Sequence, residues 1–149
     1  MILYMDTSAL VKRYVREKGS DDVIALIEQA DSVGAVVLTE VEIAATLAKS
    51  VRQGWVDQGT ASQAWQDFRQ HWISFARLSI TTATLERASG LAWEYGLRGY
   101  DAMHFASALA WQDAIDTPVT LATYDRELWS AAQKARVDVW PGGLGQTTP

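Results

Sequence analysis

The sequence of 149 residues contains no cysteine and only three prolines. Without thiolates, the chain has neither a disulfide framework nor a zinc site built on cysteine. No stretch approaches the roughly 20 apolar residues that cross a membrane. The first residues, Met1 to Asp6, also lack the basic start of a signal peptide. We therefore expect a soluble protein of the cytoplasm that does not contact a membrane.

An excess of positive charge is missing as well. The formal net charge is −5, whereas a protein that holds nucleic acid through phosphate contacts alone is expected to be basic. The charge is only weak evidence against a nucleic-acid ligand. Bound cations would cancel the charge of a carboxylate cluster, and local patches of charge matter more than the total.

What the chain does contain is typical of one globular α/β domain. Hydrophobic residues make up 48% of it, and short apolar segments alternate with amphipathic ones, which predicts a parallel sheet covered by helices on both faces. We predict strands at 2–5, 32–38, 76–80, 118–123 and 137–140, and helices at 8–16, 21–30, 39–52, 57–75, 83–95, 101–113 and 125–134. The expected fold is a single domain at 1–141, with a central parallel sheet of four to five strands and a flexible tail at 142–149.

Three acidic residues lie near the carboxyl ends of these strands, where ligands gather in parallel sheets, and a fourth is a candidate for the same edge. Asp6 ends the first strand, Glu42 lies in the first turn of the helix after the second, and Asp125 follows the fourth. Asp101 reaches the same edge if its helix starts there. Taken singly, each acid is also explained by helix capping or by the helix dipole. Hydroxyl residues at the same junctions are alternative caps, so the acids are partly redundant for that role.

Carboxylates that converge repel one another, and each raises the pKa of the others unless a cation joins them. Carboxylate oxygens suit Mg²⁺ or Mn²⁺. Such ions lower the pKa of a bound water and stabilise the attacking and leaving oxygens of a phosphodiester. Four converging acids are therefore a pattern that metal-dependent hydrolysis of phosphodiesters can use.

Four blocks of the sequence resemble the signature blocks of PIN-domain proteins, and in particular the VapC toxins of bacterial and archaeal type II toxin–antitoxin systems. They are residues 1–12 (MILYMDTSALVK), 39–49 (TEVEIAATLAK), 97–109 (LRGYDAMHFASAL) and 121–128 (LATYDREL). The likeness runs from Met1 to about Trp140, and the third block is the most specific. It implies a PIN-like domain, a cognate VapB-like antitoxin, a homodimer and a cytoplasmic location.

The resemblance also implies an activity, that of a metal-dependent endoribonuclease that is the toxin of its pair. Metal-activated water would hydrolyse RNA and leave a 3′-hydroxyl and a 5′-phosphate. The acids that coordinate Mg²⁺ or Mn²⁺ and catalyse the reaction would be Asp6, Glu42, Asp101 and Asp125. Ser8 and Thr123 match small hydroxyl residues that orient carboxylates or metal-bound water.

The second block departs from the family pattern. A hydrophobic or aromatic residue usually stands two places before the family's glutamate, and here that residue is Glu40. The second acid is therefore either Glu40 or Glu42. We favour Glu42, because Ile43 and two alanines follow it as in the family. On a helix the two side chains point about 200° apart, so only one of them can face the site.

Three further residues have two interpretations each. His104 follows Asp101 by three residues and lies on the same helical face. It is either a metal ligand or general acid, or a partly buried histidine that makes hydrogen bonds. Arg98 and Arg126 are close to two of the acids in sequence. Each either binds phosphate or forms ion pairs with those acids.

Two other functions compete with the ribonuclease. The first is a non-catalytic binding module of PIN type, against which the intact set of acids argues. The second is an aspartate-based phosphatase, with Asp6 as nucleophile. That class commonly has a second aspartate two residues after the first, and here Ser8 stands at that position.

Overall fold

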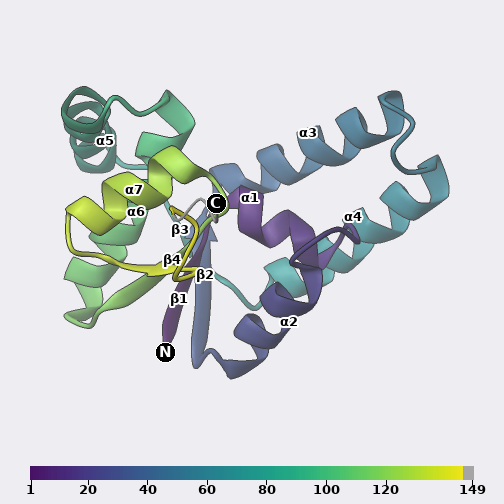
Figure 1. Ribbon diagram of the computed structural model, residues 1–149, viewed down its shortest axis with the longest axis horizontal. Coiled ribbons are helices and arrows are strands. Elements are labelled where there is room, and N and C mark those ends of the chain that lie inside the picture. The colour runs from purple at the N-terminus through teal and green to yellow at the C-terminus, as the bar shows by residue number, and fades with distance from the viewer. Residues whose placement is uncertain (146–149) are drawn as a thin grey trace.

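The computed structural model describes residues 1–145 and has the expected α/β architecture (Figure 1). Five parallel strands form one sheet in the order β3-β2-β1-β4-β5. The strands are β1 (Ile2–Met5), β2 (Ser32–Val36), β3 (Ala76–Leu78), β4 (Val119–Ala122) and β5 (Asp138–Trp140). β1 is the central strand, so the residue that follows it lies at the middle of the carboxyl edge of the sheet.

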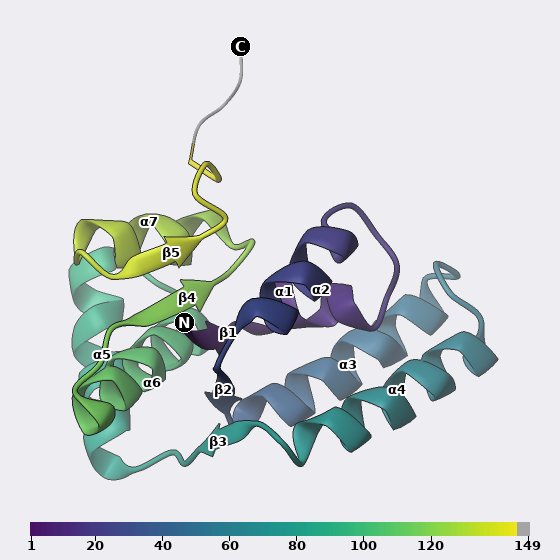
Figure 2. The same ribbon diagram turned by 90° about the horizontal axis from the view of Figure 1, so that it is seen from below.

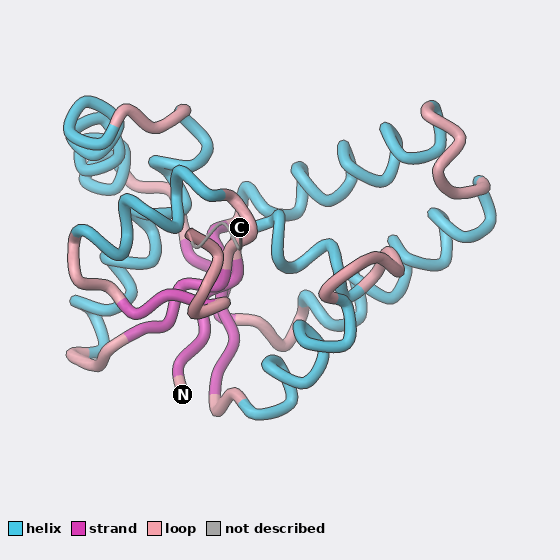
Figure 3. Tube along the Cα trace, viewed as in Figure 1, coloured by secondary structure: helices cyan, strands magenta, loops and turns pink. Residues whose placement is uncertain are grey.

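Helices cover both faces of this sheet (Figure 2). Among the described residues they are α1 (Thr7–Leu10), the 3₁₀ helix η1 (Val11–Arg13), α2 (Ser20–Gln29), α3 (Leu38–Arg52), α4 (Gln58–Trp72), α5 (Thr82–Tyr95), α6 (Gly99–Ile115) and α7 (Arg126–Lys134). Helices α1 to α4 lie on one side and α5 to α7 on the other. The α3–α4 pair extends away from the sheet as a long hairpin (Figure 3).

The alternation of side chains along β1 builds the two cores. Leu3 and Met5 point to the side of α1–α4, where they pack in one buried cluster with residues such as Phe68. Tyr4 points to the opposite side and joins the cluster that contains Phe105 of α6. All three strand residues have no exposed surface. A strand buried on both faces is expected to be continuously apolar, as β1 is.

The predicted strands and helices are all present, and with one exception their ends fall within three residues of the expected positions. The exception is the helix expected at 8–16, which is instead the four-residue α1 followed by the 3₁₀ turn η1. A helix this short gains little from its own hydrogen bonds, so tertiary contacts decide its shape. Here Tyr14 leaves the helix and packs edge-on against Phe68 of α4.

The C-terminal tail expected at 142–149 falls partly outside the described residues, because these end at residue 145. Within them, Gly145 lies against Trp129 of α7, since a Cβ at Gly145 would come within 2.6 Å of the indole ring. The Trp129 Nε1 donates a hydrogen bond of 2.7 Å to the carbonyl oxygen of Pro141. The domain boundary at residue 141 stays a prediction. No helix within residues 1–145 is long and apolar enough to span a membrane.

Gly34 of β2 lies directly beneath Trp111 of α6. A Cβ on Gly34 would come within 2.7 Å of two atoms of the Trp111 ring and 3.0 Å of the Ala76 carbonyl oxygen. We expect Gly34→Ala to lower the free energy of unfolding by about 1–3 kcal/mol through overpacking, as measured by urea denaturation.

Gly90 of α5 is the matched control, because a Cβ there meets nothing within 4 Å. Gly90→Ala should raise the free energy of unfolding by roughly 0.5–1 kcal/mol, since alanine favours a helix interior. A Gly34→Ala protein as stable as the wild type would contradict the packing described for β2 and α6.

Candidate active site

The carboxyl ends of β1 and β4 are neighbours, and this pairing determines where the first acid lies. The register joins Met5 to Ala122, and the backbone N–H of Asp6 continues the pairing with a 3.0 Å hydrogen bond to the Ala122 carbonyl oxygen. The next residue of the second strand, Thr123, therefore lies beside Asp6. Asp6 is only 4% exposed.

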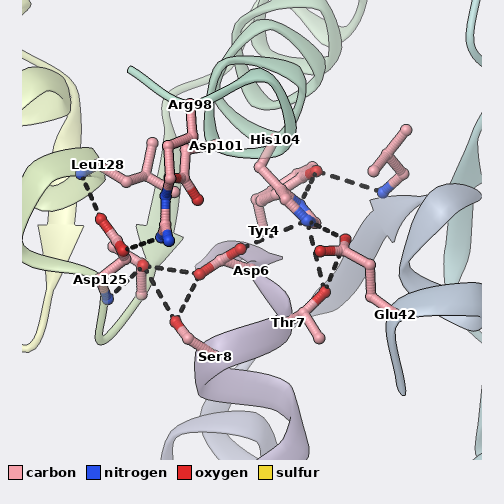
Figure 4. A network of polar contacts seen from close by, with 12 residues as sticks. Tyr4, Asp6, Thr7, Ser8, Glu42, Arg98, Asp101, His104, Asp125 and Leu128 are labelled. Carbon is pink, nitrogen blue, oxygen red and sulfur yellow. Dashed lines mark hydrogen bonds and ion pairs between the residues drawn. The ribbon is translucent and has the colours of Figure 1, made fainter. Parts of the chain in front are cut away.

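Two hydroxyl groups hold the carboxylate of Asp6 (Figure 4). Thr123 Oγ1 donates to Asp6 Oδ2 over 2.8 Å, and Ser8 Oγ donates to the same oxygen. Ser8 Oγ itself accepts a 2.9 Å bond from the backbone N–H of Tyr124. The structure thus places the hydroxyls of Ser8 and Thr123, which were expected to orient carboxylates or metal-bound water, at the carboxylate of Asp6.

Glu42 enters the same region from α3. Its Oε1 accepts a 3.0 Å hydrogen bond from Thr7 Oγ1 and lies 2.6 Å from His104 Nε2. The same His104 nitrogen is 3.4 Å from Asp6 Oδ1. His104 is 1% exposed, and its Nδ1 lies 2.9 Å from the hydroxyl of Tyr4. It is therefore the buried, hydrogen-bonded histidine of the second interpretation.

Glu40 does not share this environment. It lies two residues earlier in α3 and is exposed. Within residues 1–145 it takes part in no side-chain hydrogen bond or ion pair, whereas Glu42 contacts both Thr7 and His104. Of the two glutamates, the structure brings only Glu42 to Asp6.

Asp101 and Asp125 are joined by an arginine. Arg98 precedes α6, and its Nε donates to Asp101 Oδ2 while its Nη2 donates to Asp125 Oδ2, each over 2.9 Å. The other oxygen of Asp125 caps α7 by accepting a 2.8 Å bond from the N–H of Leu128. Of the four acids, only Asp125 caps a helix with its side chain. Capping therefore does not explain the other three.

Burial and charge both act on these groups. Burial raises the pKa of Asp101, the charges of Asp125 and Asp6 raise it further, and Arg98 lowers it, so that the net pKa lies above the usual value. Burial lowers the pKa of His104, but the carboxylates around it, those of Asp6 and Glu42 above all, outweigh burial and raise the pKa overall. The raised pKa of Asp101 comes mainly from its burial, whereas that of His104 comes from the negative charge of the carboxylates around it.

The donor set suits a hard cation, although it is not arranged around one. Carboxylate oxygens are the ligands that Mg²⁺ and Mn²⁺ prefer, and four carboxylates border this edge. Within residues 1–145, however, no three His, Asp or Glu side chains lie close enough together to hold a metal ion as they stand. The positive charge between Asp101 and Asp125 is that of the Arg98 guanidinium.

Arg126 lies elsewhere. It is the first residue of α7 and is exposed. It borders a shallow recess with Tyr95 and Lys134, on the side of α7 that faces the end of α5. The structure therefore brings Arg98 to the acids and leaves Arg126 apart from them.

Sequence reasoning missed two residues of the site, Tyr4 and Thr7. Tyr4 belongs to a buried strand in which any large apolar side chain would be expected. Its hydroxyl is distinguished only by its contacts with His104 Nδ1 and with the backbone N–H of Val36. Thr7 directly follows Asp6, and the presence of a hydroxyl next to an acid was the only sequence feature that could have identified it as a residue of the site.

The chain is also similar to known proteins over most of its length. The family model for the PIN domain matches residues 3–134. The chain is similar to Ribonuclease VapC45 of Mycobacterium tuberculosis, with 32% identity over 143 residues that cover 96% of this chain and 97% of that protein.

Two solved structures show the same fold. PAE2754 from Pyrobaculum aerophilum superposes with a TM-score of 0.65 at 24% identity, covering 97% of this chain and 87% of the other. A toxin–antitoxin complex from Klebsiella pneumoniae contains a chain that superposes with a TM-score of 0.59 at 19% identity, covering 84% and 87%.

Proposed function

The chain belongs to the PIN-domain family, and on that premise we propose that it is an endoribonuclease, the toxin of a toxin–antitoxin pair. The observation that supports the proposal is that Asp6 and Glu42 both contact His104 and that the charge of Asp6 also acts on Asp101, while none of the three acids caps a helix with its side chain. A relative that matches nearly the whole chain is named as a ribonuclease.

We propose Mg²⁺ or Mn²⁺ as the cofactor, held by Asp6 and Asp101 with Glu42 and Asp125 completing the cluster. Such a cation would supply a water of lowered pKa and would neutralise charge on the phosphate. The residues of the chain prepare the site for it. Thr123 and Ser8 hold one oxygen of Asp6, and helix α6 brings Asp101 to the same edge.

Arg98 is the residue that we propose binds the phosphate of RNA. Its side chain is 72% exposed although it contacts two acids. A guanidinium has five N–H donors, and two are used by Asp101 and Asp125, so others remain for phosphate oxygens. Arg126 is the weaker candidate for this role, because it lies apart from the acids.

For partners, we propose a VapB-like antitoxin and a second copy of the chain. Support for the antitoxin comes from a similar fold within a toxin–antitoxin complex. Support for protein contacts comes from an apolar recess beside the start of α6, lined by Leu38, Ile80, Leu85, Gly99, Tyr100 and Met103, since exposed apolar patches commonly mark interfaces. We expect the chain to act in the cytoplasm. A measurement of its molecular mass in solution distinguishes a monomer from a homodimer.

The neighbouring pair Glu42 and Glu40 gives a test of the active site. We expect Glu42→Gln to lower the rate of cleavage of a labelled RNA in Mn²⁺ by about 100-fold or more, because residues that merely orient metal ligands already contribute about 10- to 100-fold. EDTA should abolish cleavage by the wild type.

Glu40→Gln is the matched control, since it makes the same chemical change on the same turn of α3 at an exposed side chain. It should cleave at the wild-type rate. The assignment is wrong if Glu40→Gln is inactive and Glu42→Gln is active. Cleavage that persists in EDTA would contradict the role of the cation.

Arg98 and Arg126 give a second test, in which RNA binding is measured at several salt concentrations. Each arginine is replaced in an Asp6→Asn protein, so that the RNA is bound but not cleaved. Arg98→Ala should weaken binding and reduce the slope of log K against log salt by about one, because one phosphate contact is lost. Arg126→Ala removes the same charge from the neighbouring helix and should change the slope less. An equal loss in both variants would mean that only overall charge matters.

A further inference from the structure

We propose that His104 is a positioning residue, which holds Glu42 through a hydrogen on Nε2 and leaves the second oxygen of Glu42 available to the cation. The inference rests on the proposed function in that Glu42 is taken as part of the metal cluster. It assigns His104 a role other than metal ligand or general acid.

The two nitrogens of the His104 ring face different partners (Figure 4). Nδ1 lies 2.9 Å from the hydroxyl of Tyr4. Nε2 lies 2.6 Å from Glu42 Oε1 and 3.4 Å from Asp6 Oδ1. The ring is 1% exposed, so its partners in the protein determine where its hydrogen lies.

The contact with Glu42 determines that Nε2 carries a hydrogen. The backbone N–H of Val36 donates to the Tyr4 hydroxyl over 3.3 Å, which leaves the hydroxyl hydrogen free to bond Nδ1. An ionised carboxylate can only accept, so the contact with Glu42 requires a hydrogen on Nε2. A ring with its hydrogen on Nε2 and a lone pair on Nδ1 therefore satisfies every partner.

The opposite tautomer would place a bare Nε2 at 2.6 Å from a carboxylate oxygen with no hydrogen between them. Two lone pairs would then face each other in a buried site, where an unmade hydrogen bond costs most. A metal ion on Nε2 also requires a bare nitrogen. The geometry thus excludes His104 from the ligand set for as long as Glu42 keeps this contact.

The consequence concerns the second oxygen of Glu42. Thr7 and His104 both bond to Oε1, and within residues 1–145 no hydrogen bond is made to Oε2. The Glu42 side chain is 22% exposed. Two donors on one oxygen fix the plane of the carboxylate and leave the other oxygen for a cation or its water. Residues that orient metal ligands in this way are as much a part of a metal site as the ligands themselves.

The direct test is ¹⁵N NMR of the His104 ring in the wild-type chain, with and without Mg²⁺. We expect Nε2 to resonate as a protonated nitrogen in both conditions. A bare Nε2, or loss of its hydrogen when Mg²⁺ is added, would overturn the proposal and make His104 a ligand. This measurement does not depend on RNA cleavage.

Two substitutions test the role in function. The amide nitrogen of glutamine reaches as far as Nε2 of histidine, whereas that of asparagine reaches only as far as Nδ1. His104→Asn should therefore weaken Mn²⁺ binding by about 10- to 100-fold, as measured by electron paramagnetic resonance, and His104→Gln should restore most of the affinity. The same order should appear in kcat, with little change in the KM for RNA.

Phe105→Leu is the control for damage to α6, because Phe105 has no exposed surface and packs in the apolar core against Tyr95 of α5. It should bind Mn²⁺ like the wild type. Equal affinities for His104→Asn and wild type would overturn the positioning role. A wild type that binds Mn²⁺ and has a protonated Nε2 but cuts no RNA would contradict the proposed function and leave this inference intact.

Discussion

Repulsion between carboxylates is the constraint on which this site depends. Asp6 and Asp125 both add to the raised pKa of Asp101, beyond the effect of burial. The chain offsets the repulsion with donors from several elements. Hydroxyls hold Asp6, the N–H groups of Arg98 bridge Asp101 and Asp125, and His104 holds Glu42. Such a concentration of negative charge is costly to a fold and is of use where a cation has to bind.

The sheet makes this arrangement rigid. β1 is paired on both sides by parallel strands and buried on both faces, so the position of Asp6 at its end is fixed by a strand whose last three residues have no exposed surface. One face of the strand supplies Leu3 and Met5 to the core, and the other supplies Tyr4, whose hydroxyl reaches His104 of α6. The same strand therefore positions one acid directly and a second acid through a histidine.

Much of the fold follows from the sequence, because apolar periodicity marks the strands and helices and the acids fall where strands end. Local pattern did not settle three points. The segment 8–16 was expected to be one regular helix, but it is a short helix followed by a 3₁₀ turn, because Tyr14 packs against Phe68 of α4. Arg126 directly follows Asp125 and Arg98 precedes Asp101 by three residues, yet only Arg98 donates hydrogen bonds to both Asp101 and Asp125. The role of Tyr4 depends on the distance between β1 and α6, which no local pattern encodes.

The most direct measurement of the central claim is the melting temperature of the metal-free chain with added Mn²⁺, compared with that of Asp101→Asn. If the carboxylates are gathered to hold a cation, Mn²⁺ stabilises the native state of the wild type, and the melting temperature rises with concentration and saturates. Asp101→Asn should respond much less. A wild-type melting temperature that Mn²⁺ leaves unchanged, or an equal rise in both proteins, would contradict the account.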